Sequence, residues 1–221
     1  YDKLKKQYSH EIIGPLGQGV GVCEGIAKTV KILCDALGIG CIIAIAEANP
    51  DKQIKYRHAW NIIELDGMYY HFDATFDNSL SQDGIIRYDY FLLDDAYIFR
   101  DQESLVWPVP SCTNGEHSYY RQKKLSFTRM EDVQKRAGQA VKKGKPLVFH
   151  WRGGGLSKDS LQQILQCIEA EAKAKGKHSR ISVNLPQAVF QITFQNQPQE
   201  TVVQESVDVE GNVVQEEIIH E

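Results

Sequence analysis

The sequence predicts a mixed α+β fold, and three observations support this prediction. They are a helical pattern of apolar residues early in the chain, a hairpin signal between two alternating strands, and an alternation of helices and strands in the second half. The chain has 221 residues, of which 42% are hydrophobic. Such a chain can bury one good core and a second small one. We therefore expect a helix packed on an antiparallel sheet, followed by a small α/β module.

The first predicted element is a helix over about residues 24–37. Apolar residues recur there at helical spacing, namely Ile26, Ala27, Val30, Leu33, Cys34 and Leu37. Gly38 then supplies a C-terminal stop. Cys23 falls in the first turn, where unpaired N–H groups and the helix dipole favour a thiolate and can hold an oxyanion. We expect the glycines before and after it, Gly21 among them, to leave room for a substrate backbone near the sulfur.

The segment from His58 to Asp73 is predicted to form two β-strands joined by a tight turn. Asp66-Gly67 is the dipeptide most suited to a two-residue type I′ turn, and as the loop it would set Asp73 opposite Trp60. Side-chain alternation then puts His58 and Asp73 on one face as diagonal neighbours. Their Cα atoms would lie roughly 7–8 Å apart, close enough for the imidazole and the carboxylate to share a hydrogen bond.

Cys23, His58 and Asp73 together supply the groups of a thiol-based acyl-transfer site. His58 would hold the sulfur as a thiolate, Asp73 would orient His58, and the thiolate would attack an amide carbonyl to form a thioester. Attack of water on that thioester makes the protein a hydrolase, whereas attack of an amine makes it a crosslinking transferase. The sequence leaves both outcomes open. In the competing interpretation Cys23 is only a small buried hydrophobic residue.

Three segments around these residues carry a family resemblance: GVGVCEGIAKTVKILCDALGI, HAWNIIELDGMYYHFDATFDNS and RYDYFLL. They resemble the transglutaminase-like superfamily, specifically bacterial domains related to eukaryotic transglutaminases and to papain-fold thiol hydrolases. The resemblance implies a papain-like core in which the Cys23 helix packs on an antiparallel sheet carrying His58 and Asp73. It also implies that these residues form a catalytic triad acting on peptide or protein amide bonds. One departure is mild, since Phe76 stands where such families often have tryptophan.

Further candidate residues come from the same segments. Trp60 shares the face of His58 and could shield the hydrogen bond to Asp73 from water, although a tryptophan on a sheet is commonly plain core. His10 is a candidate side-chain donor of the oxyanion hole, with a surface histidine as the other interpretation. The competing functional class is a catalytically silent module that binds peptides or cell wall and has kept the groove.

Other classes of site and partner are disfavoured. His58, His71 and Asp73 could in principle bind a metal, but Cys23 gives His58 a simpler role, so we expect neither metal nor cofactor. A net charge of −4 with interspersed signs argues against nucleic acid, and no apolar run is long enough to insert in a membrane. The partner is therefore expected to be a peptide or protein substrate. Because the chain begins at Tyr1, we expect a preceding N-terminal part with a targeting signal, and export or a cell-surface location.

Changes of pattern divide the chain into four parts. We expect a transglutaminase-like domain over 1–112, a linker over 113–127, a small α/β module over 128–195, and a tail over 196–221. The composition of the tail fits either an acidic extension or a hairpin that turns near residues 210–212.

The α/β module is predicted from periodicity and stop signals alone. Thr128 and Glu131 form a capping-box pattern that opens a helix, which Gly144 ends. We then expect a strand, a helix and two further strands over residues 147–151, 158–175, 181–185 and 188–194. No catalytic cluster is recognisable in this module, so we expect it to be structural or to position substrate.

Overall fold

The computed structural model describes residues 1–82, 84–196, 202–207 and 213–218, and it confirms a mixed α+β fold. The chain forms two compact units, each built from separate stretches of sequence. Unit 1 contains Tyr1–Thr128, Val148–Leu156 and Val183–Phe190, and unit 2 contains Arg129–Leu147, Ser157–Ser182 and Gln191–Glu221. The units therefore differ from the consecutive segments that the sequence predicts.

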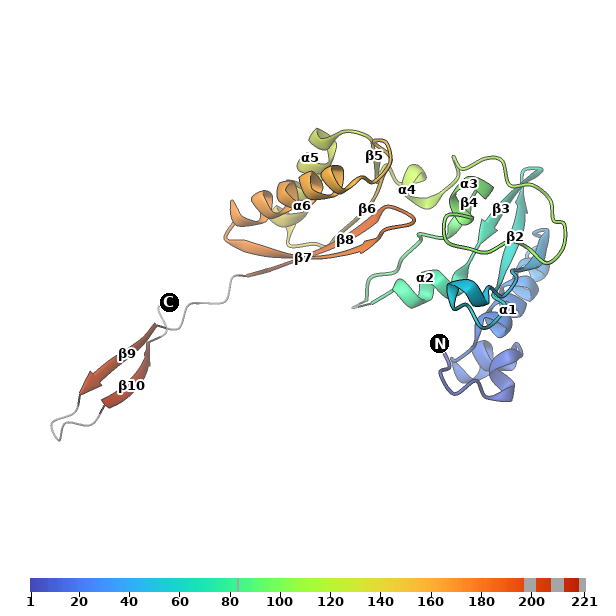
Figure 1. The fold of residues 1–221 in the computed structure, drawn as a ribbon, viewed down its shortest axis with the longest axis horizontal. Helices are drawn as coiled ribbons and strands as arrows, with labels where there is room; N and C mark the ends of the chain where they lie inside the picture. Colours follow the sequence, from blue (N-terminus) through green and yellow to red (C-terminus); the bar gives the residue numbers. More distant parts are fainter. Residues whose placement is uncertain (83, 197–201, 208–212, 219–221) are drawn as a thin grey trace. The chain divides into compact units, whose positions relative to one another are not determined.

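Unit 1 begins with two short helical turns that lead into a long helix. They are η1 (Gln7–His10), the π-helical turn η2 (Gly14–Gln18) and α1 (Cys23–Ala36). The predicted helix is thus confirmed to within one residue at each end, and Gly38 follows it in a left-handed conformation with φ of 70°. The helix lies against the first two strands of the neighbouring sheet (Figure 1), with Val30 and Cys34 packed on the core there, whereas Leu33 and Leu37 of the predicted apolar pattern are exposed.

That sheet is antiparallel and has the order β1-β2-β3-β4. Its strands are β1 (Cys41–Ile45), β2 (Ala59–Leu65), β3 (Met68–Phe72) and β4 (Phe91–Leu93). Asp66 and Gly67 both have positive φ, at 53° and 74°, as a type I′ turn requires. Ile62 pairs with His71, so the predicted register of the hairpin is confirmed.

The hairpin ends sooner than the sequence suggests. His58 directly precedes β2, and Asp73 follows β3 as the N-cap of α2 (Ala74–Leu80). Thr75 is already helical, because the carboxylate of Asp73 accepts the free N–H groups of the first helical turn. Both predicted site residues therefore lie at the open end of the hairpin, beyond its last paired residues.

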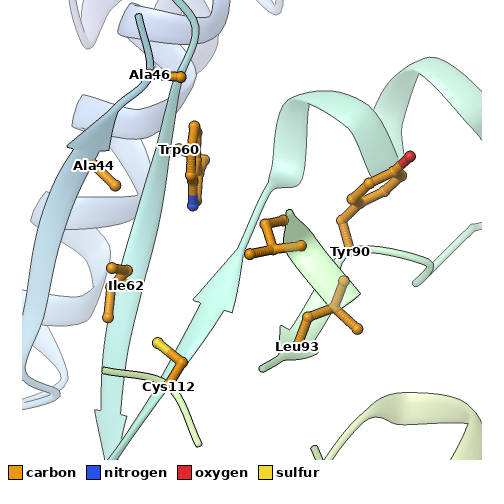
Figure 2. Close-up of a cluster of buried hydrophobic side chains, with 8 residues drawn as sticks. Ala44, Ala46, Trp60, Ile62, Tyr90, Leu93 and Cys112 are labelled. Carbon is orange, nitrogen blue, oxygen red and sulfur yellow. The ribbon is translucent and has the colours of Figure 1, made fainter. Parts of the chain in front are cut away.

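Alternation along the strands separates two small cores on the two faces of the sheet. One face contributes Trp60 and Ile62 to a cluster with residues of β1, β4 and the later loops, which Figure 2 shows in close-up. The opposite face contributes Ile63 and Tyr70 to a cluster against α1. The side-chain directions predicted for the hairpin are therefore correct, and Trp60 is almost fully buried.

Short elements complete the first stretch of unit 1, Tyr1–Thr128. They are η3 (Pro50–Lys52), α3 (Asp95–Ile98), α4 (Tyr119–Gln122) and β5 (Ser126–Phe127). The stretch 113–127, predicted as a linker, is thus folded into unit 1. Its Tyr120 is buried and donates a hydrogen bond of 2.8 Å to Asp89, which also pairs with the buried Arg87 at 2.6 Å. This network anchors the segment.

The second half contains a four-stranded sheet of order β5-β6-β8-β7 and two longer helices. The elements are α5 (Met130–Lys143), β6 (Leu147–Trp151), α6 (Lys158–Lys173), β7 (Lys177–Asn184) and β8 (Val189–Asn196). The predicted strands and helices are all present. The predicted capping box is wrong, however, because the N-cap of α5 is Arg129 and its first turn has no side-chain cap.

The tail contains β9 (Val202–Val207) and β10 (Val213–Ile218), paired antiparallel. Of the two interpretations of the tail, these strands support the hairpin, while the expected turn at 210–212 lies outside the described residues. Within the described part of the chain, no helix combines the length and apolarity needed to cross a membrane.

Candidate active site

The sulfur of Cys23 lies at the very start of α1, where the local structure is built for an anion. Val22 before it is extended and caps the helix with no side-chain hydrogen bond, so the first-turn N–H groups face outward. The sulfur accepts hydrogen bonds from the backbone N–H groups of Glu24 and Ala59 and is hydrogen-bonded to the imidazole of His58. Burial raises the pKa of the Cys23 thiol, but these hydrogen bonds and the His58 charge outweigh burial, and the net pKa is lowered.

His58 connects this sulfur to Asp73. Its Nε2 donates a hydrogen bond of 2.6 Å to Oδ2 of Asp73, which leaves Nδ1 for Cys23. Burial disfavours the imidazolium, yet the hydrogen bonds and negative charges of Asp73 and Cys23 prevail and raise the pKa of His58 to about 9. A lowered thiol pKa beside a raised imidazole pKa favours the thiolate–imidazolium ion pair at neutral pH.

Asp73 is completely buried, and N–H donors surround its carboxylate. As the N-cap of α2, it accepts backbone N–H groups from Thr75 and Phe76 on Oδ1, each at 3.0 Å. Its Oδ2 accepts from His58 and from Nε2 of Gln102 at 3.0 Å. The helix start and Gln102 thus fix the carboxylate in the orientation that holds His58.

Aromatic rings enclose the imidazole of His58. Phe76 stacks on it with ring centroids 4.8 Å apart, and Trp60 lies at 5.8 Å on a nearly parallel plane. Only 18% of the His58 side chain is exposed. Trp60 therefore occupies the predicted shielding position, although it is also a core residue, and Phe76 shares this role.

An open groove of about 750 Å³ runs past the sulfur. Cys23 and His58 line it together with side chains from the N-terminal segment, the β1–β2 region and residues 101–103, among them Tyr1, Ile54, Tyr56 and Gln102. The size of the groove suits a short peptide segment, and its walls mix apolar, aromatic and charged groups.

The N-terminal segment supplies two residues that line the groove, His10 and Tyr1. His10, the candidate donor of the oxyanion hole, lines the groove, but its Nδ1 is hydrogen-bonded at 2.9 Å to Glu24, which also pairs with Lys28. Tyr1 was not foreseen. Burial and the negative charges of Cys23 and Asp2 raise the pKa of its phenol, so the phenol lies within electrostatic reach of the sulfur.

Gly21 and Gly25, on either side of Cys23, make room for other parts of the chain. This corrects the expectation that they make room for substrate. A Cβ on Gly21 would lie 2.8 Å from the Pro15 side chain and close to Ile26. A Cβ on Gly25 would collide with the carbonyl oxygen of Ser9. These glycines therefore allow the N-terminal turns η1 and η2 to pack tightly against the start of α1.

A second histidine and aspartate lie deeper in unit 1. Nε2 of His71 binds Oδ1 of Asp95 at 2.8 Å, and the ligand atoms of His71, Asp95 and Cys112 lie within 4.8 Å of one another. We call these three the buried cluster, and Cys23, His58 and Asp73 the groove cluster.

The hydrogen bonds of the buried cluster do not fit a metal site. Nδ1 of His71 accepts the indole N–H of Trp60 at 3.0 Å, so the ring proton of the neutral imidazole is on Nε2 and points at Asp95. A metal at Nε2 would have to displace that proton and its hydrogen bond. Burial accordingly lowers the pKa of His71 against the opposing effect of Asp95.

Comparison with known protein families finds no family that matches this chain, and comparison with curated proteins finds no relative. The geometry and chemistry of the groove cluster therefore carry the functional argument.

Proposed function

We propose that this protein is a thiol-dependent acyl-transfer enzyme acting on peptide or protein amide bonds. The observation that carries the proposal is the connected chain from the Cys23 sulfur through His58 to the buried Asp73, at a helix start and in an open groove. The antiparallel sheet with α1 packed on it, together with the sequence resemblance, supports a transglutaminase-like core for residues 1–112.

In the first half of the reaction, the Cys23 thiolate attacks the carbonyl carbon of the amide and a C–S bond forms. Negative charge moves to the carbonyl oxygen, which the positive end of the α1 dipole beside Cys23 stabilises. The imidazolium of His58 then gives its Nδ1 proton to the amine nitrogen as the C–N bond breaks. The amine leaves and a thioester on Cys23 remains.

The second half of the reaction returns the enzyme to its starting state. Water or an amine attacks the thioester carbonyl, and Nδ1 of His58 accepts the proton that the nucleophile loses. The C–S bond breaks and Cys23 leaves as a thiolate. Asp73 keeps Nε2 protonated throughout, so that Nδ1 is the nitrogen that exchanges protons with the reactants.

A peptide library incubated with and without a primary amine, followed by mass spectrometry, tests this proposal. Cleavage, deamidation or amine incorporation would each give a distinct mass change, and each should disappear in the Cys23→Ala variant. A library that stays unmodified under all conditions, while peptides still bind the groove, would show the protein to be a silent binding module instead.

A further inference from the structure

Two cysteines outside the proposed active site lie against each other where α1 leads into β1. Cys34 is in the last turns of α1 and Cys41 is the first residue of β1. Their thiols are in hydrogen-bond contact, and Cys34 packs on the small core that contains Cys41, Ile63 and Tyr70. None of the five cysteines is in a disulfide, and these two pack on the same small core with their thiols close enough to interact.

We propose that Cys34 and Cys41 form a reversible disulfide that joins the end of α1 to the start of β1. The turn between them is held in place by two backbone hydrogen bonds, from Ile39 N–H to the Cys34 carbonyl at 2.9 Å and from Glu64 N–H to the Gly40 carbonyl at 2.8 Å. A disulfide needs its two Cα atoms within about 7 Å of each other, a condition that side chains already in contact across a fixed turn favour.

The oxidant is a small disulfide of the glutathione type. The half-buried Cys34 is the thiol that such a molecule can reach, and its thiolate attacks one sulfur of the oxidant, releasing one small thiol and leaving a mixed disulfide. Cys41 then attacks the Cys34 sulfur and releases the second small thiol. The two protons lost by Cys34 and Cys41 end on the two released thiolates, so the protein is oxidised and the small disulfide is reduced.

Nearby charge and burial affect the reactivity of the two thiols. The ammonium of Lys31, which is ion-paired with Asp35 at 2.6 Å, lies close enough to interact with both thiols. Burial, with the neighbouring Cys34, raises the pKa of Cys41 to about 12. Cys34 is therefore the thiol that reacts first with the oxidant, and Cys41 is the thiol that resolves the mixed disulfide.

This disulfide would connect two elements that support the groove cluster. α1 begins with Cys23, and β1 pairs with β2, which directly follows His58. Asn61 on β2 adds a third link, since its side-chain amide donates to the Ala27 carbonyl at 3.0 Å and contacts the Cys41 sulfur at 3.4 Å. The disulfide should thus stabilise unit 1 whether or not the protein is an enzyme.

The test uses the full chain with Cys23→Ala, so that the thiol of the proposed nucleophile does not consume the oxidant. After equilibration with oxidised and reduced glutathione and alkylation of free thiols, residues 32–52 form a single tryptic peptide that contains Cys34 and Cys41 and no other cysteine. We expect this peptide to lack both alkyl groups and two hydrogens. Cleavage before Asp35 should then give two fragments that separate only after reduction.

A melting experiment gives an independent readout. Oxidation should raise the melting temperature by about 5 °C, because the disulfide restrains the unfolded chain. The half-exposed Cys34→Ser variant should lose the shift, whereas Cys167→Ser should keep it. Alkylation of both cysteines in the 32–52 peptide, or the same shift in Cys34→Ser, would overturn the proposal.

Discussion

The groove cluster and the buried cluster contain the same three residue types, a cysteine, a histidine and an aspartate, yet their ionisation is opposite. In the groove cluster the histidine pKa is raised to about 9 and the cysteine pKa is lowered. In the buried cluster the histidine pKa is lowered, and burial with two nearby aspartates raises the cysteine pKa to about 12. Residue composition alone therefore does not make a nucleophile.

The two clusters differ in the hydrogen-bond partner of one nitrogen of the histidine ring. In both of them the aspartate binds Nε2 of the histidine, at 2.6 Å for His58 and 2.8 Å for His71. The other nitrogen of His58 is available to the Cys23 thiol, whereas that of His71 is taken by the indole N–H of Trp60. A thiol at a helix start gains a base only where that second nitrogen is free.

The largest expected effect comes from removing each sulfur in turn. Cys23→Ala should lower kcat/KM on a peptide substrate by about 10⁴-fold or more, because no other group can form the thioester. Cys112→Ala should leave kcat/KM within about two-fold of the parent value, since its sulfur has no role in the reaction. A comparable loss in both variants, with the fold intact, would show that the two clusters are not functionally distinct.

Alkylation rates compare the two sulfurs directly. Near neutral pH, iodoacetamide should label Cys23 at least about 10³-fold faster than Cys112, because only about one in 10⁵ of the Cys112 thiols is ionised at pH 7 when the pKa is about 12. Site-resolved mass spectrometry measures both rates in one sample.

The pH dependence of Cys23 labelling sharpens this test. Since the pKa of the Cys23 thiol is lowered, labelling should be fast even at pH values below the usual pKa range of thiols. It should slow down only when acid protonates the sulfur. Acyl transfer also needs the imidazolium as acid, so kcat should fall as pH rises through about 9, the raised pKa of His58. Equal slow labelling of both sulfurs would contradict the ion pair.

The two aspartates offer a subtler comparison. Asp73→Asn should lower kcat by about 10²-fold or more with the fold retained, because an amide at that position can favour the wrong tautomer of His58. Asp95→Asn should leave kcat nearly unchanged, since its amide oxygen can still accept from Nε2 of His71. Enzyme kinetics and thermal melting on the two purified variants measure the difference, and unchanged turnover in Asp73→Asn would remove that residue from the mechanism.

The parts of the site that the sequence predicts are those fixed by local rules. The Asp66-Gly67 turn sets the register, and the register places His58 and Asp73 side by side. Helical periodicity likewise places Cys23 in the first turn of α1. Each of these inferences needs only a few neighbouring residues.

The parts that the sequence does not predict depend on contacts between distant segments. Gln102 reaches Asp73 from a loop with no periodic pattern, so its sequence position carries no sign of this role. Gly21 and Gly25 indicate a close approach, but local sequence cannot tell whether the approaching group is a substrate or, as here, the chain's own Pro15 and Ser9. Strand alternation carries the predicted hairpin up to Asp73, whereas in the structure this aspartate caps the following helix.

The smallest expected change tests the hydrogen bond that distinguishes the two clusters. Trp60→Phe keeps an aromatic ring near His58 but removes the N–H that His71 accepts, leaving a buried unpaired acceptor that should lower the free energy of unfolding by about 1–3 kcal/mol. The exposed Trp107→Phe is the matched control and should cost far less.

The same variant shows whether a free ring nitrogen is sufficient to activate a thiol. With Nδ1 of His71 released, labelling of Cys112 by iodoacetamide should still rise by less than about ten-fold, because that sulfur remains buried and the charges of Asp94 and Asp95 disfavour its thiolate. Catalysis at the groove cluster should fall only a few-fold. Labelling of Cys112 at the rate of Cys23 would mean that the partner of Nδ1 alone decides reactivity, and that burial and the neighbouring carboxylates contribute little.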